Sequence, residues 1–199
     1  MTVHLQRGDL LLVIDPQVDF VTGALAVPDA PSVVPAINRY IREFGRCGLP
    51  VVATRDWHPP GHVSFRGSGG PWPQHCVQGR PGAEFAAGLA LRPDDEVVSK
   101  ATDADRDAYS AFDHTCLDLL LHGRDVRRLF ACGLATDYCV RATVLDALRL
   151  GYVVFVLADA IRAVDVHPED GREAVHEMRA AGAVAIAFPD IDCAVPVDG

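Results

Sequence analysis

The sequence has no apolar run long enough to span a membrane, no internal repeat and no block of basic residues. It carries 18 lysines and arginines against 27 aspartates and glutamates, a net charge of −9. This balance argues against nucleic acid or a membrane surface as partner. Residues 1–9 lack the apolar core of a signal peptide, so we expect a cytoplasmic protein. The six cysteines show no closely spaced pairs, and we expect most of them to be free thiols.

The chain has the length and composition of one globular domain. It has 199 residues, 49% of them hydrophobic, which is enough to bury a core, so we predict a single domain over residues 1–199. Short apolar runs typical of buried parallel strands occur at 10–14, 51–54, 97–99, 128–132, 153–157 and 184–187. Segments with helical periodicity lie between them, at 32–46, 112–122, 138–150 and 168–181. This alternation predicts a three-layer α/β/α sandwich around a mostly parallel six-stranded sheet.

Polar side chains follow four of the predicted strands. Asp15, Asp56 and Lys100 stand at or just after the ends of the first three, and the turn that carries Cys139 follows the fourth. Ligands bind at the carboxyl ends of the strands in folds of this class. We therefore expect these four side chains to converge on one edge of the sheet.

The segment 129–140 (LFACGLATDYCV) reads as a buried strand, a tight turn and a cysteine on the first turn of a helix. Free backbone N–H groups at a helix start favour an anion, so we expect the Cys139 thiol to lean toward thiolate. Gly133 and Ala135 suit a turn whose N–H groups face a developing oxyanion. Cys132, inside the strand, is expected to be a core residue.

Residues 56–95 fit no regular element, and loops of this length in a compact domain are usually functional or disordered. In an extended Asp56-x-His58 both side chains point to the same side and reach one ion. His75 is the third expected ligand and His62 a possible fourth. Carboxylate and imidazole ligands suit zinc, iron or manganese, with zinc as the first expectation. The alternative is a polar surface loop with ordinary solvated histidines.

Asp15 and Lys100 together form a candidate base for the Cys139 proton. Burial raises the pKa of a carboxyl, and a nearby ammonium opposes that shift. The alternative is a structural ion pair beside an inert cysteine. Three aromatic residues are candidate walls for a flat ring: Phe20, Trp72 and Tyr109.

Six short motifs are spread along the chain: 13–20 (VIDPQVDF), 54–62 (TRDWHPPGH), 72–76 (WPQHC), 100–103 (KATD), 107–112 (DAYSAF) and 133–140 (GLATDYCV). In these motifs the chain resembles, between Leu10 and Phe188, the nicotinamidases (pyrazinamidases) of the isochorismatase-like cysteine hydrolase superfamily. The cysteine turn alone indicates only the superfamily. The metal-loop motifs, together with 100–103 and 107–112, are typical of nicotinamidases. One departure is Ala101, where a glycine is common in the family.

The resemblance implies the residues of an active site. It implies a catalytic triad of Asp15, Lys100 and Cys139, and a divalent metal on Asp56, His58 and His75, with His62 matching a ligand found in some members only. It also implies a cis peptide between Leu134 and Ala135, with the N–H groups of Ala135 and Cys139 as the oxyanion hole. Phe20, Trp72 and Tyr109 match the ring-binding pocket.

The implied activity is hydrolysis of nicotinamide, and of pyrazinamide, to the acid and ammonia through a cysteine thioester, in salvage toward NAD. Two alternatives stay open at this point. One is a related metal-independent cysteine hydrolase acting on another small amide, such as an N-carbamoyl compound or ureidoacrylate. The other is a non-catalytic metal-binding protein of the same fold. A homo-oligomer is a further possibility. An apolar helix face could bind a second copy of the chain, and in sequence such a face looks the same as a core face.

Overall fold

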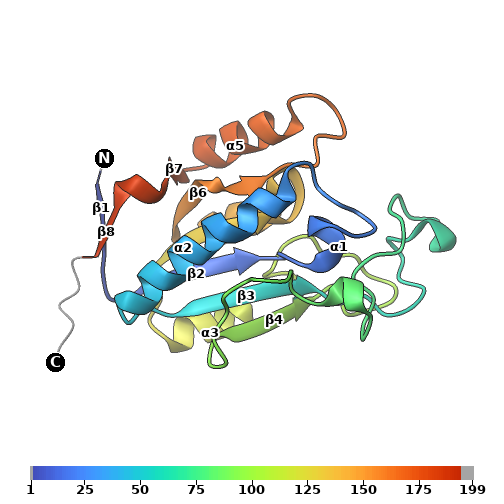
Figure 1. Cartoon of the computed structure of the whole chain (residues 1–199), viewed down its shortest axis with the longest axis horizontal. Helices are drawn as coiled ribbons and strands as arrows, with labels where there is room; N and C mark the ends of the chain where they lie inside the picture. Colours follow the sequence, from blue (N-terminus) through green and yellow to red (C-terminus); the bar gives the residue numbers. More distant parts are fainter. Residues whose placement is uncertain (1, 194–199) are drawn as a thin grey trace.

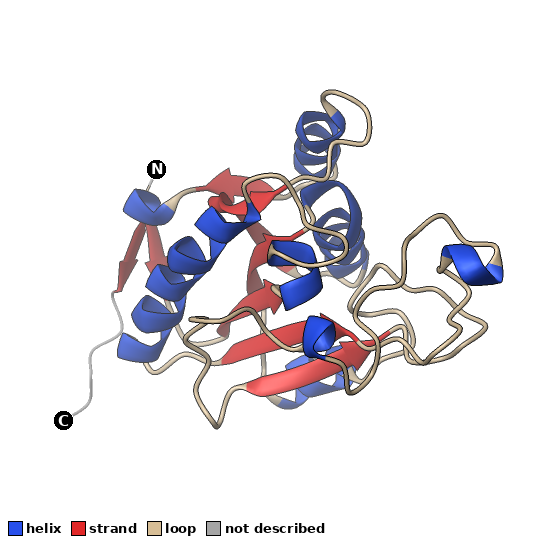
Figure 2. Ribbon diagram, turned by 45° about the vertical axis from the view of Figure 1, so that its right-hand side comes forward, coloured by secondary structure: helices blue, strands red, loops and turns tan. Residues whose placement is uncertain are grey.

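A computed structural model describes residues 2–193 and shows a sheet of six strands between two layers of helices (Figures 1 and 2). The strands lie in the order β4-β3-β2-β5-β6-β7, and all five neighbouring pairs are parallel. Their bounds are β2 Asp9–Ile14, β3 Val51–Asp56, β4 Glu96–Lys100, β5 Arg128–Leu134, β6 Val153–Arg162 and β7 Val184–Ile186. The predicted three-layer α/β/α sandwich is confirmed, and its sheet is entirely parallel.

Within residues 2–193, five α-helices and several short helical turns accompany these strands. The α-helices are α1 Val18–Val21, α2 Val33–Arg46, α3 Leu117–Gly123, α4 Arg141–Arg149 and α5 Asp170–Ala180. The turns are η1 Ala30–Ser32, η2 Arg66–Ser68, η3 Pro81–Ala83, η5 Phe188–Asp190 and the π-helical turn η4 Thr136–Val140. The sequence predicted α2 closely. The predicted start of α3 at 112 is wrong, because residues 112–116 form turns before the helix begins.

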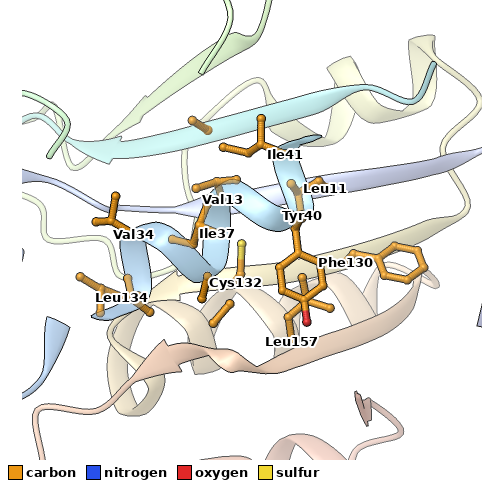
Figure 3. Packing of buried hydrophobic residues seen from close by; sticks show 14 of the residues in the cluster. Leu11, Val13, Val34, Ile37, Tyr40, Ile41, Phe130, Cys132, Leu134 and Leu157 are labelled. Atoms are coloured by element: carbon orange, nitrogen blue, oxygen red, sulfur yellow. The ribbon is translucent and has the colours of Figure 1, made fainter. Parts of the chain in front are cut away.

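The two faces of the sheet pack against different helices. Along β2, Leu11 and Val13 face the core beneath α2, whereas Leu10, Leu12 and Ile14 face the core beneath α3, α4 and α5. Figure 3 shows Ile37 and Tyr40 of α2 packed toward the strands. Both faces are buried, which explains why β2 is a continuous apolar run rather than an alternating one. Cys132 is fully buried in this core, as predicted.

A second, two-stranded sheet was not predicted. β1 (Val3–Leu5) pairs in parallel with β8 (Ile191–Cys193), which brings the two ends of the described chain together at the left of Figure 1. Runs of three residues are too short for a periodicity signal. β8 also carries a correction, because Cys193 forms a disulfide with Cys47 at the end of α2. These cysteines are 146 residues apart, so only the folded chain reveals the pair; the other four cysteines are free.

The carboxyl ends of the strands share one edge with the long loops. In Figure 1 the arrowheads of β2, β3 and β4 point toward the loops drawn in teal and green, which belong to residues 56–95. Within residues 2–193 we find no helix that is both long and apolar enough to cross a membrane.

Candidate active site

Asp15, Lys100 and Cys139 meet at this edge of the sheet, as predicted. The Lys100 ammonium lies 3.0 Å from Oδ2 of Asp15 and 3.3 Å from Sγ of Cys139. All three side chains are buried: Asp15 is 0% exposed, Lys100 1% and Cys139 5%. A buried ammonium thus lies between a carboxylate and a thiol in one water-poor space.

Lys100 also contacts Asp56, a contact that the sequence did not predict. Its Nζ lies 2.5 Å from Oδ1 of Asp56 and donates to the carbonyl of Ala108 at 3.2 Å. Burial opposes the charge of Lys100, but Asp15, Asp56 and Cys139 outweigh it and hold the pKa of Lys100 well above its usual value. Lys100 is therefore a permanent cation shared by two carboxylates.

The pKa of Cys139 differs from expectation. Burial raises the pKa of the thiol well above its usual value; Lys100 opposes this, and the carboxylates of Asp15 and Asp56 add to it. The expected lean toward thiolate is therefore wrong for the resting site. The loss of solvation and two nearby negative charges outweigh the start of a helix. The thiol needs a base at the moment of reaction.

Asp15 has the properties of that base. Burial raises the pKa of its carboxyl, with Asp56 adding to the shift, while Lys100 and Thr54 oppose it. Its Oδ1 accepts a hydrogen bond from the Thr54 hydroxyl at 2.6 Å. Its Oδ2 is buried and, within the described chain, accepts no hydrogen bond, although it pairs with Lys100. One carboxylate oxygen of Asp15, one of Asp56 and the Cys139 sulfur lie within 4.8 Å of one another, so the Asp15 carboxylate lies close to the thiol.

Asp56, His58 and His75 form a cluster beside this triad. One ligand atom from each lies within 4.8 Å of the others, and all three residues are buried. Oδ2 of Asp56 is 3.6 Å from Nε2 of His58, which is buried without a hydrogen-bond partner in the described structure. A buried nitrogen without a partner is costly, and a metal ion would satisfy it. The donor set of one carboxylate and two imidazoles fits a divalent metal.

The charges of the cluster also suit a metal. Burial opposes ionisation of Asp56, but Lys100 and His58 outweigh it and lower the pKa of that carboxyl. Burial lowers the pKa of His75, which favours the neutral imidazole that binds metals. A charged carboxylate beside a neutral imidazole is the state that ligation requires.

His62 lies next to the cluster, but both of its ring nitrogens have partners. Nδ1 lies 2.8 Å from Oγ of Ser64, and Nε2 lies 2.9 Å from the carbonyl of Arg106. Its ring packs on that of His58, with centroids 4.2 Å apart. This arrangement supports His58 and uses both atoms with which His62 could bind an ion.

The three predicted ring-binding residues line one pocket with the nucleophile. Phe20, Trp72 and Tyr109 stand around Cys139, and the indole N–H of Trp72 donates to the Tyr109 hydroxyl at 2.9 Å. The remaining lining residues are Leu25, Val27, Asp56, His75, Ala135, Tyr138 and Val164. The pocket is thus mostly apolar, and its polar lining comes from Cys139 and from Asp56 and His75 of the cluster.

The backbone at this edge adopts unusual conformations. Asp15 and Ala101 have φ of 48° and 51°, in the left-handed region, and the peptide between Leu134 and Ala135 is cis, as the resemblance implied. At Ala101, a left-handed backbone costs about 1–2 kcal/mol, because the residue is not a glycine. Left-handed residues of this kind cluster at functional sites.

A comparison with known families decides which family this fold and site represent. Residues 9–189 match the isochorismatase domain family. The chain belongs to the isochorismatase family. The family resemblance in the sequence is therefore confirmed.

Members with described activities match over nearly the whole chain. Nicotinamidase of Escherichia coli is 40% identical over 202 residues, with 90% of this chain and 95% of that protein covered. The structure of the pyrazinamidase of Pyrococcus horikoshii in complex with zinc has a TM-score of 0.87 and 48% identity, covering 91% of this chain and 99% of that one. A structure from L. infantum in complex with nicotinate has a TM-score of 0.88 and 35% identity, covering 97% of this chain and 100% of that one.

Sequence reasoning missed three residues of this isochorismatase-family site. Tyr138 contacts both pocket aromatics, with ring centroids 5.1 Å from Trp72 and 5.5 Å from Tyr109. Thr54 could have been found, because it lies two residues before Asp56 on a strand and so shares its side. Gln17, inside the first motif, gave no signal beyond its position in that motif.

Proposed function

We propose that this chain is a nicotinamidase, an amidohydrolase that converts nicotinamide to nicotinate and ammonia, with pyrazinamide as a second substrate. The observation that carries the proposal is the buried Lys100 ammonium, within 3.3 Å of both the Asp15 carboxylate and the Cys139 sulfur. The pocket above Cys139 is narrow, apolar and lined by aromatic rings, which suits a flat heteroaromatic amide.

The proposed reaction begins with proton transfer from Cys139 to Oδ2 of Asp15. The thiolate sulfur then attacks the carboxamide carbon, and Lys100 compensates the negative charge that moves between sulfur and carboxylate. The N–H groups of Ala135 and Cys139 are the proposed donors to the tetrahedral oxyanion. Asp15 returns the proton to the leaving nitrogen, the C–N bond of the tetrahedral intermediate breaks, and ammonia departs to leave a thioester on Cys139.

Hydrolysis of the thioester reuses the same base. Asp15 takes a proton from water, whose oxygen attacks the thioester carbon, and the C–S bond breaks. The proton returns to the Cys139 sulfur, and nicotinate leaves with the water oxygen in its carboxylate. A raised pKa suits Asp15 for both steps, because it must accept and release a proton in each cycle.

Asp56, His58 and His75 are the proposed ligands of one divalent metal ion, with zinc as the first choice. Three observations support this proposal. Nε2 of His58 has no hydrogen-bond partner in the described structure, and the three ligand atoms lie within 4.8 Å of one another. The pyrazinamidase of Pyrococcus horikoshii, a relative, has a structure in complex with zinc. A metal at this position supplies a Lewis acid that orients and polarises the ring of the substrate. His62 is proposed as a support for His58 rather than as a ligand, because its nitrogens are bonded elsewhere.

Ammonia release from nicotinamide by the zinc-loaded protein tests this function. Cys139→Ala is expected to abolish release without unfolding the chain, and mass spectrometry is expected to find a thioester on the Cys139 peptide during turnover. Full activity of Cys139→Ala would overturn the mechanism. Turnover of an N-carbamoyl amide or ureidoacrylate by metal-free protein, with none of nicotinamide, would favour the related metal-independent hydrolase.

Loss of metal from His58→Ala and His75→Ala, measured by elemental analysis, tests the ligand set. Unchanged metal content in either variant would contradict it. A single domain, a cytoplasmic location and a role in salvage toward NAD stay predictions, and the oligomeric state is open to sedimentation measurements.

A further inference from the structure

Gln17 is a fully buried glutamine that the mechanism does not use. Its Oε1 accepts a hydrogen bond from the backbone N–H of Asp56 at 2.7 Å, and its Nε2 donates to the carbonyl of Asp56 at 2.8 Å. Nε2 also donates to the carbonyl of Ala83 at 2.9 Å. One side-chain amide therefore binds both backbone groups of a proposed metal ligand.

The sheet explains why Asp56 needs this contact. β2 and β3 pair in parallel, and Asp15 N–H still donates to the carbonyl of Thr54 at 3.2 Å. The next bond of such a ladder would run from Asp56 N–H to the carbonyl of Asp15. That carbonyl instead accepts from the N–H of Gln17 at 2.8 Å, because the chain turns away at Asp15. The Gln17 amide takes the place of the missing peptide group.

The bonds of Gln17 also reach the long loop. Ala83 belongs to η3, in the segment that contains His75, and Val18 N–H donates to the carbonyl of Glu84 at 2.9 Å. A primary amide has two N–H donors and a carbonyl acceptor, and Gln17 uses all of them here. A carboxylate at this place would offer no donor to the carbonyls of Asp56 and Ala83.

We propose that Gln17 is the positioning residue of Asp56, holding its backbone so that one carboxylate oxygen reaches Lys100 and the other reaches the metal. The inference rests on the proposed function, since it assumes a metal on Asp56, His58 and His75. It predicts that loss of the amide weakens metal binding in a chain that remains folded. Partners that orient metal ligands typically change metal affinity by roughly 10- to 100-fold when replaced.

The chain offers a matched control in Asn38. Its amide donates to the carbonyl of Gly88 at 2.7 Å and accepts from the N–H of Ala90 at 2.8 Å. It therefore bonds to the backbone of the same long segment, but it does so from a half-buried position on α2 and has no hydrogen bond to the cluster. Asn38→Ala removes two similar bonds without contact to Asp56.

The experiment measures zinc affinity by competition with a chelating dye, and folding by circular dichroism and thermal unfolding. The folded Gln17→Glu variant is expected to have a zinc affinity roughly 10- to 100-fold lower than that of the unchanged protein. The zinc affinity of the Asn38→Ala variant is expected to equal that of the unchanged protein. Gln17→Met, which fills the space without a charge, is expected to weaken binding as well. If the Gln17→Glu variant does not fold, the Gln17→Met variant takes its place in the comparison.

Two outcomes would overturn the inference: a folded Gln17 variant with unchanged zinc affinity, or failure of both variants to fold, which would make Gln17 a structural residue. A protein that binds zinc and hydrolyses nicotinamide, but whose Gln17 variants bind zinc equally well, overturns the inference and leaves the proposed function standing. Absence of zinc binding in the unchanged protein is instead a failure of the proposed function.

Discussion

The hydroxyl of Thr54 donates to Oδ1 of Asp15 at 2.6 Å, and the other oxygen of that carboxylate lies 3.0 Å from the Lys100 ammonium. Thr54 is fully buried at the end of β3, so this bond is shielded from water. It occupies one carboxylate oxygen, while the other pairs with the ammonium that also contacts the thiol. A single hydroxyl thus orients the base of the proposed reaction.

Thr54→Val is expected to shift the acid limb of the pH profile of kcat/KM to higher pH. The raised pKa of Asp15 already places this limb above the 3.8 of an ordinary aspartate, because activity is lost when Asp15 is protonated. The Thr54 bond lowers that pKa, so its removal raises the pKa further. A bond to a charged group contributes about 1.5 kcal/mol or more, so the limb should move by about one pH unit. Thr54→Ser keeps the hydroxyl and should retain the original limb; an unshifted limb in Thr54→Val would refute the role.

Lys100→Met is expected to inactivate the protein and to lower its free energy of unfolding by about 3–5 kcal/mol, because it leaves the buried carboxylates of Asp15 and Asp56 without their cation. Urea denaturation monitored by circular dichroism measures the loss. Cys139→Ala serves as the control, since it is equally inactive but removes no charge. Equal stability of the two variants would show that Lys100 does not hold the carboxylates together.

Gly133→Ala is expected to destabilise the fold by about 3 kcal/mol or more, through overpacking and a left-handed backbone together. Gly133 has φ of 117°, and a Cβ there would overlap the carbonyl oxygen of Ile14 on the neighbouring strand. Gly151 has φ of 92° with open space around it, so Gly151→Ala isolates the backbone contribution of about 1–2 kcal/mol. Thermal unfolding of both variants measures the difference, and equal losses would exclude the clash with β2.

Cys47→Ser is expected to lower the free energy of unfolding by about 2–5 kcal/mol, because the disulfide to Cys193 closes a long loop and restricts the unfolded chain. Mass spectrometry without reductant should find Cys47 and Cys193 in one linked pair of peptides. Cys116→Ser, at an exposed free cysteine, should leave stability unchanged. Free thiols at both positions in the purified protein would contradict the disulfide.

The strands and the direction of their carboxyl ends could be predicted because they depend on local pattern. After their first residues, β2 and β5 are continuous runs without charged side chains, and Asp15 directly after β2 marks the point where that strand leaves the core. Parallel pairing then brings Asp15, Asp56, Lys100 and Cys139 to one edge. The residues of the site followed from this periodicity and from short motifs.

Only the tertiary structure decided which atoms of these residues contact one another. The sequence by itself determined a parallel α/β sheet with Cys139, Asp15, Lys100 and the proposed metal ligands along one edge. It did not determine that Lys100 pairs with Asp56, that Gln17 completes the ladder beside Asp56, or that Cys47 meets Cys193, because each contact joins segments far apart in the chain. It also misjudged the thiol, since a pKa depends on burial and on the charges that folding brings near.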